Sequence, residues 1–232
     1  MTPSLILALD VPAAADALAL VDAFEGRCSF YKIGLELFTA VGPALIVALR
    51  ARGVEVFLDL KLHDIPNTVR QAARRAAAHD VRLLTVHASG GEAMLAAAVD
   101  GAGDRCGILG VTVLTSLAAD ELAAAWGRGP WLDVQSEVLR LAGLADSAGA
   151  HGIVCSGAEL PAVMHRYGGR LAPLVPGVRP AGAPGNDQAR VVTPEAAARA
   201  GARYLILGRA VTAAPEPLAA WDAIARSIAA AA

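Results

Sequence analysis

Eight short apolar runs, each followed by an Ala-rich stretch of helical character, place the strongest constraint on the fold of this chain. The runs are continuously apolar, which is typical of parallel strands that are covered on both faces. Strands are predicted at residues 5–10, 30–34, 54–58, 83–88, 108–114, 152–156, 171–175 and 204–208. Helices are predicted at residues 13–24, 43–52, 69–79, 92–99, 119–126, 134–147, 158–167, 194–200 and 218–230.

Strands that alternate with helices over short connections form parallel sheets through right-handed crossovers. Eight such units favour a closed (β/α)8 barrel, the TIM barrel, over an open doubly wound sheet. The chain has 232 residues, of which 55% are hydrophobic, and this suits one barrel without an added domain. We therefore expect a single α/β domain over residues 1–232.

Charge and cysteine content exclude several classes of protein. The formal net charge is −2 and no basic block occurs, so a nucleic-acid partner is not expected. No apolar stretch is long enough to span a bilayer, and the first residues lack the cationic start of a secretory signal. The three cysteines lie far apart without a CxxC motif, as expected for buried thiols in the cytoplasm.

Residues 59–68 follow the third strand and read Asp-Leu-Lys-Leu-His-Asp-Ile-Pro-Asn-Thr. A strand alternates its faces, so Asp59 and Lys61 should point the same way. Such charges are costly to bury, and two interpretations remain open: an ion pair that closes a layer of the barrel, or a catalytic site. The strand period does not fix the direction of Asp64, which lies past the predicted strand end. Pro66 predicts the turn into a helix.

Chemistry in this type of barrel lies at the C-terminal ends of the strands. The polar residues at those ends are Asp10, Lys32, Asp59, Lys61, His87, Thr115, Ser116, Ser156, Arg179 and Arg209. Asp10 and Lys32 could extend the Asp59–Lys61 pair into an alternating charged network, or each could be a charge at the rim. We expect His87 and Ser156 to pack or to support the residues of the site, and His63 either to brace the turn or to act as an acid or base. The sequence has no Cys/His/Asp/Glu cluster with metal-ligand spacing.

The last two strands predict a phosphate site. Arg179 follows strand seven within Pro-Gly-Val-Arg-Pro, and Gly208 with Arg209 follows strand eight. Barrels commonly bind phosphate there through backbone N–H groups and a helix N-terminus, and arginine adds bidentate hydrogen bonds. The alternative to a phosphate site is that Gly208 serves only as a turn residue and Arg209 is a solvated charge. Gln188 lies in a long loop over residues 177–192, which is either a lid that closes on the ligand or a merely flexible loop.

Seven stretches in chain order resemble the orotidine 5'-phosphate decarboxylase family. They lie at residues 8–10, 32–38, 57–68, 113–116, 176–180, 187–188 and 208–209. The most specific is residues 57–68, which read Phe-Leu-Asp-Leu-Lys-Leu-His-Asp-Ile-Pro-Asn-Thr. The segment from Trp126 to Leu132 matches no signature of the family.

The resemblance implies decarboxylation of orotidine 5'-phosphate to uridine 5'-phosphate, with neither a metal nor an organic cofactor. It implies that Lys61 donates a proton to C6 of the pyrimidine within a network of Lys32, Asp59, Lys61 and Asp64. Further implied substrate contacts are Asp10, Lys32 and Asp59, then Thr115, Ser116, Arg179, Gln188, Gly208 and Arg209. It also implies a homodimer with a shared site, in which Asp64, Ile65 and Thr68 reach the site of the partner subunit.

Two other functions compete with this one. Mg²⁺-dependent keto-sugar-phosphate decarboxylases and hexulose-phosphate synthases, on a similar barrel, resemble the chain in the spacing of Asp59, Lys61 and Asp64. A non-catalytic barrel that binds a phosphate ligand is the second. Lys32 stands where a metal ligand would be needed, and residues 63–68 favour the nucleotide enzyme.

Overall fold

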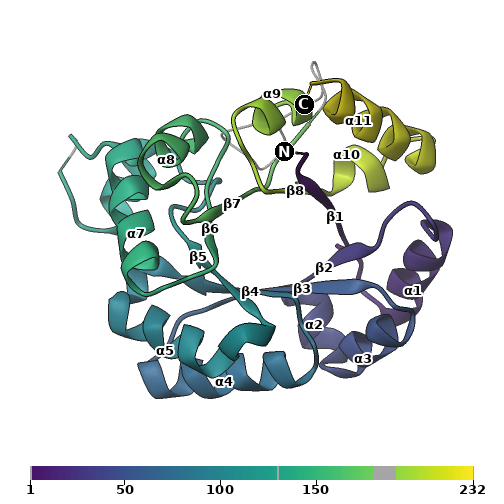
Figure 1. Ribbon diagram of the computed structural model, residues 1–232, viewed down its shortest axis with the longest axis horizontal. Coiled ribbons are helices and arrows are strands. Elements are labelled where there is room, and N and C mark those ends of the chain that lie inside the picture. Colours follow the sequence, from purple (N-terminus) through teal and green to yellow (C-terminus); the bar gives the residue numbers. More distant parts are fainter. Residues whose placement is uncertain (1, 130, 180–191, 232) are drawn as a thin grey trace.

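The computed structural model describes residues 2–129, 131–179 and 192–231 (Figure 1). Eight parallel strands follow one another in chain order around a closed barrel, with helices outside the ring. The first strand, β1 (Ser4–Ala8), pairs with the last, β8 (Tyr204–Leu207), and this pairing closes the barrel. The predicted (β/α)8 TIM barrel is thus confirmed.

The remaining strands are β2 (Phe30–Gly34), β3 (Glu55–Leu62), β4 (Leu83–His87), β5 (Gly107–Val111), β6 (Gly152–Val154) and β7 (Ala172–Val175). The helices are α1 (Ala14–Ala23), α2 (Leu35–Val41), α3 (Ala44–Ala51), α4 (Pro66–Ala78), α5 (Glu92–Ala102), α6 (Ala119–Ala125), α7 (Val134–Ser147), α8 (Leu160–Tyr167), α9 (Pro194–Arg199), α10 (Arg209–Thr212) and α11 (Pro217–Ala231). Within the described ranges, no helix has the length and apolarity needed to cross a membrane.

Two apolar clusters hold the barrel together. The larger cluster lies between the strands and the surrounding helices, and the smaller cluster lies inside the ring of strands. The inner cluster includes Ile6, Phe30, Phe57 and Ile206. Both clusters are buried. The outward-facing side chains of the strands pack against the helices, and the inward-facing side chains fill the interior of the barrel.

The inner cluster supports the charged residues above it. Side chains on a strand alternate between faces, so the second residue after an inward residue also points inward. Phe30 is therefore followed inside the barrel by Lys32, and Phe57 by Asp59. The apolar side chains form the floor on which the charged site rests.

Strand β3 differs from the prediction, because it continues beyond residue 58 to Leu62. Its pairing with β4 shifts register between Leu58 and Leu62, and Lys61 has a φ of 49°. Helix α4 begins at Pro66 instead of residue 69, and the helices α2 (Leu35–Val41) and α10 (Arg209–Thr212) were not predicted. Pro at the first helical position explains the earlier start of α4, because its missing N–H needs no partner there.

Candidate active site

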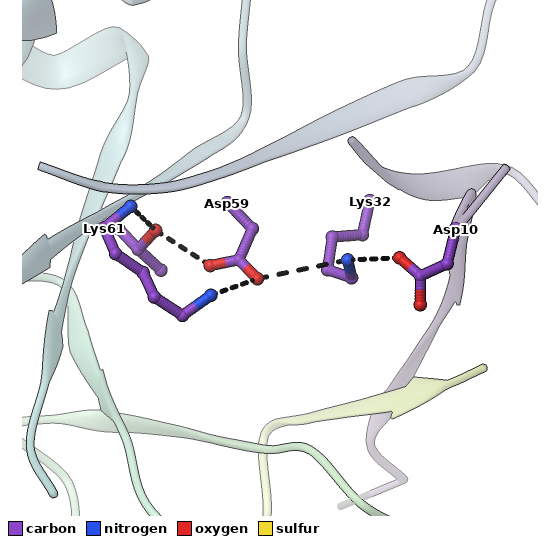
Figure 2. A network of polar contacts seen from close by, with 5 residues as sticks. Asp10, Lys32, Asp59 and Lys61 are labelled. Carbon is purple, nitrogen blue, oxygen red and sulfur yellow. Dashed lines mark hydrogen bonds and ion pairs between the residues drawn. The ribbon is translucent and has the colours of Figure 1, made fainter. Parts of the chain in front are cut away.

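Four charged side chains of alternating sign meet at the C-terminal end of the barrel (Figure 2). The ammonium of Lys32 lies 2.9 Å from Asp10 Oδ1 and 4.0 Å from Asp59 Oδ2. The ammonium of Lys61 lies 2.8 Å from the same Asp59 oxygen. Asp59 therefore stands between two cations, and the structure brings together the four residues that the sequence placed at the ends of strands one to three.

The centre of this network is removed from water. The side chains of Lys32 and Asp59 are 10% and 13% exposed, whereas that of Lys61 is 31% exposed. A buried ammonium or carboxylate without an opposite charge is strongly destabilising, so each inner charge depends on its neighbours. Both lysines line the cavity described below, and the side chain of Lys61 is the more open of the two.

Thr85, on β4, also belongs to the network, and the sequence analysis did not identify it. Its hydroxyl donates a hydrogen bond to Asp59 Oδ1 at 2.9 Å and accepts one from the Lys61 backbone N–H at 2.9 Å. The side chain is fully buried. The sequence could have indicated this role, because Thr85 is a polar residue inside the apolar run of β4 and a buried hydroxyl normally requires a hydrogen-bond partner.

A cavity of about 240 Å³ opens directly above the network. Its wall includes the four charged residues and also Thr115, Arg179, Gly208 and Arg209. Predicted site residues from β1, β2, β3, β5, β7 and β8 thus surround one space. Ser116 is exposed, and it is not among the described residues that line this cavity.

The side of the cavity formed by β7 and β8 has the features of an anion site. Gly208 directly follows β8 and precedes the short helix α10, which begins at Arg209. Arg179 lines the same cavity, and its Nε is buried with no hydrogen-bond partner among the described residues. A phosphate could accept hydrogen bonds from these groups. The predicted contact Gln188 lies outside the described residues.

Two histidines lie beside Lys61 without entering the charged network. The rings of His63 and His87 are 5.5 Å apart between centroids. Burial lowers the pKa of His87, and the nearby His63 and Lys61 lower this pKa further. His87 is therefore held neutral, in keeping with a packing role.

The comparison with family models decides the affiliation of this barrel. A family model described as "Orotidine 5'-phosphate decarboxylase / HUMPS family" matches residues 3–224. The chain belongs to this family. The match covers every strand of the barrel and all of the described residues that line the cavity.

Curated relatives match this chain over nearly its whole length. A protein of Halorhodospira halophila named orotidine 5'-phosphate decarboxylase is 51% identical over 232 residues, which is 99% of this chain and 97% of the relative. A protein of the same name from Anaeromyxobacter is 52% identical over 230 residues, covering 98% of this chain and 100% of the relative.

Solved structures show the same barrel. The crystal structure of orotidine 5'-phosphate decarboxylase from Lactobacillus acidophilus superposes with a TM-score of 0.84 at 34% sequence identity, covering 98% of this chain and 99% of that one. The enzyme of the same name from Pyrococcus horikoshii gives a TM-score of 0.77 at 27% identity, covering 97% and 99% of the two chains.

The segment after β3 does not enter this chain's own cavity. Asp64 is exposed, and its Oδ1 accepts a hydrogen bond from the backbone N–H of Ile65 at 2.6 Å. Ile65 is 67% exposed, and Thr68 is exposed as well. Among the described residues, Asp64, Ile65 and Thr68 are absent from the cavity wall. Three of the predicted family contacts therefore face outward in the single chain.

Proposed function

We propose that this chain decarboxylates orotidine 5'-phosphate to uridine 5'-phosphate and CO₂, the last step of de novo pyrimidine nucleotide biosynthesis. The observation that carries the proposal is the alternating network of Asp10, Lys32, Asp59 and Lys61 beneath a cavity that ends in Gly208 and Arg209. Relatives named for this enzyme are 51% and 52% identical over nearly their full lengths. The whole barrel would act as one catalytic domain.

The ammonium of Lys61 has the chemistry that this reaction needs. Loss of CO₂ leaves negative charge on C6 of the pyrimidine, and a fixed cation stabilises that charge electrostatically. Lys61 can then protonate C6, because an ammonium is a proton donor and its side chain lines the cavity and is 31% exposed, against 10% for Lys32. Asp59 holds Lys61 in place at 2.8 Å and would stand close to the departing carboxylate.

The remaining contacts would orient the nucleotide. Asp10 and Lys32 offer a carboxylate and an ammonium to the ribose hydroxyls, and Thr115 offers a hydroxyl to the pyrimidine. The phosphate would bind at Arg179, Gly208 and Arg209, and we assign Gln188 to the same group. Binding energy from the phosphate, remote from C6, can then favour the geometry of the transition state.

We also propose that two chains form a homodimer with shared active sites. The exposed segment from Asp64 to Thr68 supports this proposal, since Ile65 exposes an apolar side chain at 67% beside the site. A groove next to Lys61, lined by Leu9, Leu35 and Glu36, is available for a segment of the partner subunit. Asp64 of one chain would then join the network of the other.

A metal-dependent sugar-phosphate enzyme is the nearest alternative, because the family description covers more than one type of protein. Lys32 argues against it, since its ammonium already occupies the space between the carboxylates of Asp10 and Asp59. We propose a cofactor-free enzyme. A cytoplasmic location is proposed as well, because the three cysteines are buried and form no disulfide with one another.

One assay tests the reaction and separates these alternatives. Purified protein freed of metal by exhaustive chelation should deplete the absorbance of orotidine 5'-phosphate at an undiminished rate. Lys61→Ala should nearly abolish turnover, while Arg226→Ala, which removes an exposed cation from α11, should retain it. Near-normal turnover by Lys61→Ala, or activity restored only by Mg²⁺, would contradict the proposal. A barrel that merely binds phosphate would show binding without turnover.

A mixing experiment tests the shared site. Lys61→Ala and Asp64→Ala chains are each expected to be inactive as homodimers. In a mixed dimer, one of the two sites would combine an intact Lys61 with an intact Asp64 of the partner subunit. Random exchange should then restore about a quarter of the wild-type activity, as expected for two equivalent sites in a twofold dimer. No recovery despite demonstrated subunit exchange would exclude the shared arrangement.

A further inference from the structure

The pairing of β3 with β4 is interrupted at the catalytic segment. Leu58 pairs with Leu84 and Leu62 pairs with Val86. Between these two pairs, β3 contains three residues and β4 contains only Thr85. Such a bulge takes backbone groups out of the ladder and redirects the side chains of the longer strand.

The Thr85 hydroxyl satisfies the backbone group that the bulge releases. Lys61 adopts a φ of 49°, which L-residues rarely occupy, and its backbone N–H donates to Thr85 Oγ1 at 2.9 Å. A buried N–H without a partner would be costly, so this contact stabilises the bulge. The side-chain hydroxyl of Thr85 thus replaces a hydrogen bond of the strand ladder.

The same hydroxyl also orients Asp59. It has one proton, and a backbone N–H cannot accept it, so the proton goes to Asp59 Oδ1 at 2.9 Å. The other carboxylate oxygen, Oδ2, then faces the ammonium of Lys61 at 2.8 Å. A single oxygen atom therefore contacts both the backbone of Lys61 and the carboxylate that pairs with its side chain.

We infer that Thr85 is a positioning residue for the decarboxylation, which sets the relative placement of Asp59 and the Lys61 ammonium from beneath the site. This inference rests on the proposed function. Thr85 is fully buried, and it is not among the described residues of the cavity wall, so it acts through its two neighbours. Its loss should alter the chemical step more than nucleotide binding, because the phosphate contacts lie on β7 and β8.

Thr85→Val, which keeps the shape and removes the hydroxyl, tests this inference. We expect kcat to fall about 10- to 100-fold, the range typical when a supporting hydrogen bond of a site is lost. KM and the inhibition constant of uridine 5'-phosphate should change less than about threefold. Thr85→Ser, which retains the hydroxyl, should restore kcat to within about threefold of wild type.

Thr112→Val is the matched control, because Thr112, like Thr85, is a buried threonine with a hydrogen-bonded hydroxyl. The Thr112 hydroxyl donates to the backbone oxygen of Val154 at 2.7 Å and, in the described part of the chain, makes no hydrogen bond with the charged network. Thr112→Val should leave kcat unchanged. Equal kcat in Thr85→Val and wild type, or equal losses in Thr85→Val and Thr85→Ser, would overturn the inference. If the valine variant does not fold, Thr85→Ser and Thr85→Ala, which differ by one oxygen, replace it in the same comparison. Wild-type turnover of orotidine 5'-phosphate is measured in parallel. If the wild-type protein has no activity, the proposed function fails; if it is active and Thr85→Val is equally active, only the inference about Thr85 fails.

Discussion

Replacing Lys61 by glycine should leave a more stable protein than replacing it by alanine. Lys61 has a φ of 49°, and in the described part of the chain Asp80 is the other non-glycine residue with positive φ. In this region the Cβ of an L-residue lies too close to the following carbonyl oxygen, at a cost of roughly 1–2 kcal/mol. Glycine has no Cβ and avoids this cost.

The two variants isolate the backbone contribution. Both remove the ammonium, its contact with Asp59 at 2.8 Å and the expected catalytic activity, and they differ by one methyl group. The greater freedom of glycine in the unfolded chain opposes the gain by about 0.4–1 kcal/mol. The free energy of unfolding should therefore be about 1 kcal/mol higher for Lys61→Gly than for Lys61→Ala.

Urea denaturation at one fixed protein concentration measures this difference, because association would make stability depend on concentration. The control is the same pair of substitutions at Arg226, an exposed residue within helix α11. There the order should reverse, with glycine about 1 kcal/mol less stable than alanine. Alanine more stable than glycine at both positions would refute the argument that Lys61 is held in a strained conformation.

Three further predictions concern other parts of the barrel. A Cβ on Gly34 would lie 3.1 Å from Lys32 Nζ, so Gly34→Ala should displace the ammonium and lower kcat roughly tenfold in steady-state assays. Burial lowers the pKa of His87 and His151 below the ordinary 6.5, so the unfolded chain binds protons more readily. The free energy of unfolding should accordingly fall as pH drops through 6.5, by up to about 1.4 kcal/mol per pH unit for each histidine. Burial raises the pKa of Cys106 to about 12, so Ellman's reagent at pH 8 should label it at least about 100-fold faster after unfolding.

Each of these predictions has its own control. Gly143→Ala places a methyl group 3.0 Å from the Tyr167 hydroxyl, outside the site, and should leave kcat unchanged. If Gly143→Ala lowers kcat as much as Gly34→Ala does, the effect at Gly34 is not specific to the site. His151→Gln should reduce the pH dependence of stability, and an unchanged slope would contradict the assignment. Rapid labelling of Cys106 in the folded protein would show that its burial is not maintained.

The order of strands and helices followed from the sequence because the apolar runs are long and well separated. Helix α2 (Leu35–Val41) escaped prediction, since it begins directly after β2 without a connecting loop or a side-chain cap. Helix α4 begins earlier than predicted because Pro66, which was assigned to the preceding turn, is already its first helical residue. Such boundaries depend on tertiary packing more than on local pattern.

The sequence predicted which charged residues come together in the site, but it did not predict the bulge or the Thr85 contacts that hold them. The strand period correctly brought Asp59 and Lys61 together, but the reason was incomplete, because both residues lie within a bulge and Lys61 itself has a positive φ. A bulge depends on the neighbouring strand, so the sequence of β3 alone does not contain it. Thr85 was missed for the same reason: its importance comes from contacts with a strand that lies earlier in the chain.

The pairing of β1 with β8 has a consequence for the order in which the protein matures. Asp10 follows β1, and Gly208 follows β8, so neighbouring parts of the cavity wall come from opposite ends of the chain. During synthesis the first seven strands can emerge and pair while the ring remains open at β1. The sheet edge exposed by β1 stays without its partner until β8 has left the ribosome, and contacts this distant in sequence form slowly. Nascent chains that end before Leu207 should therefore have neither a closed sheet nor a phosphate site, and chaperones that shield strand edges would act in that interval.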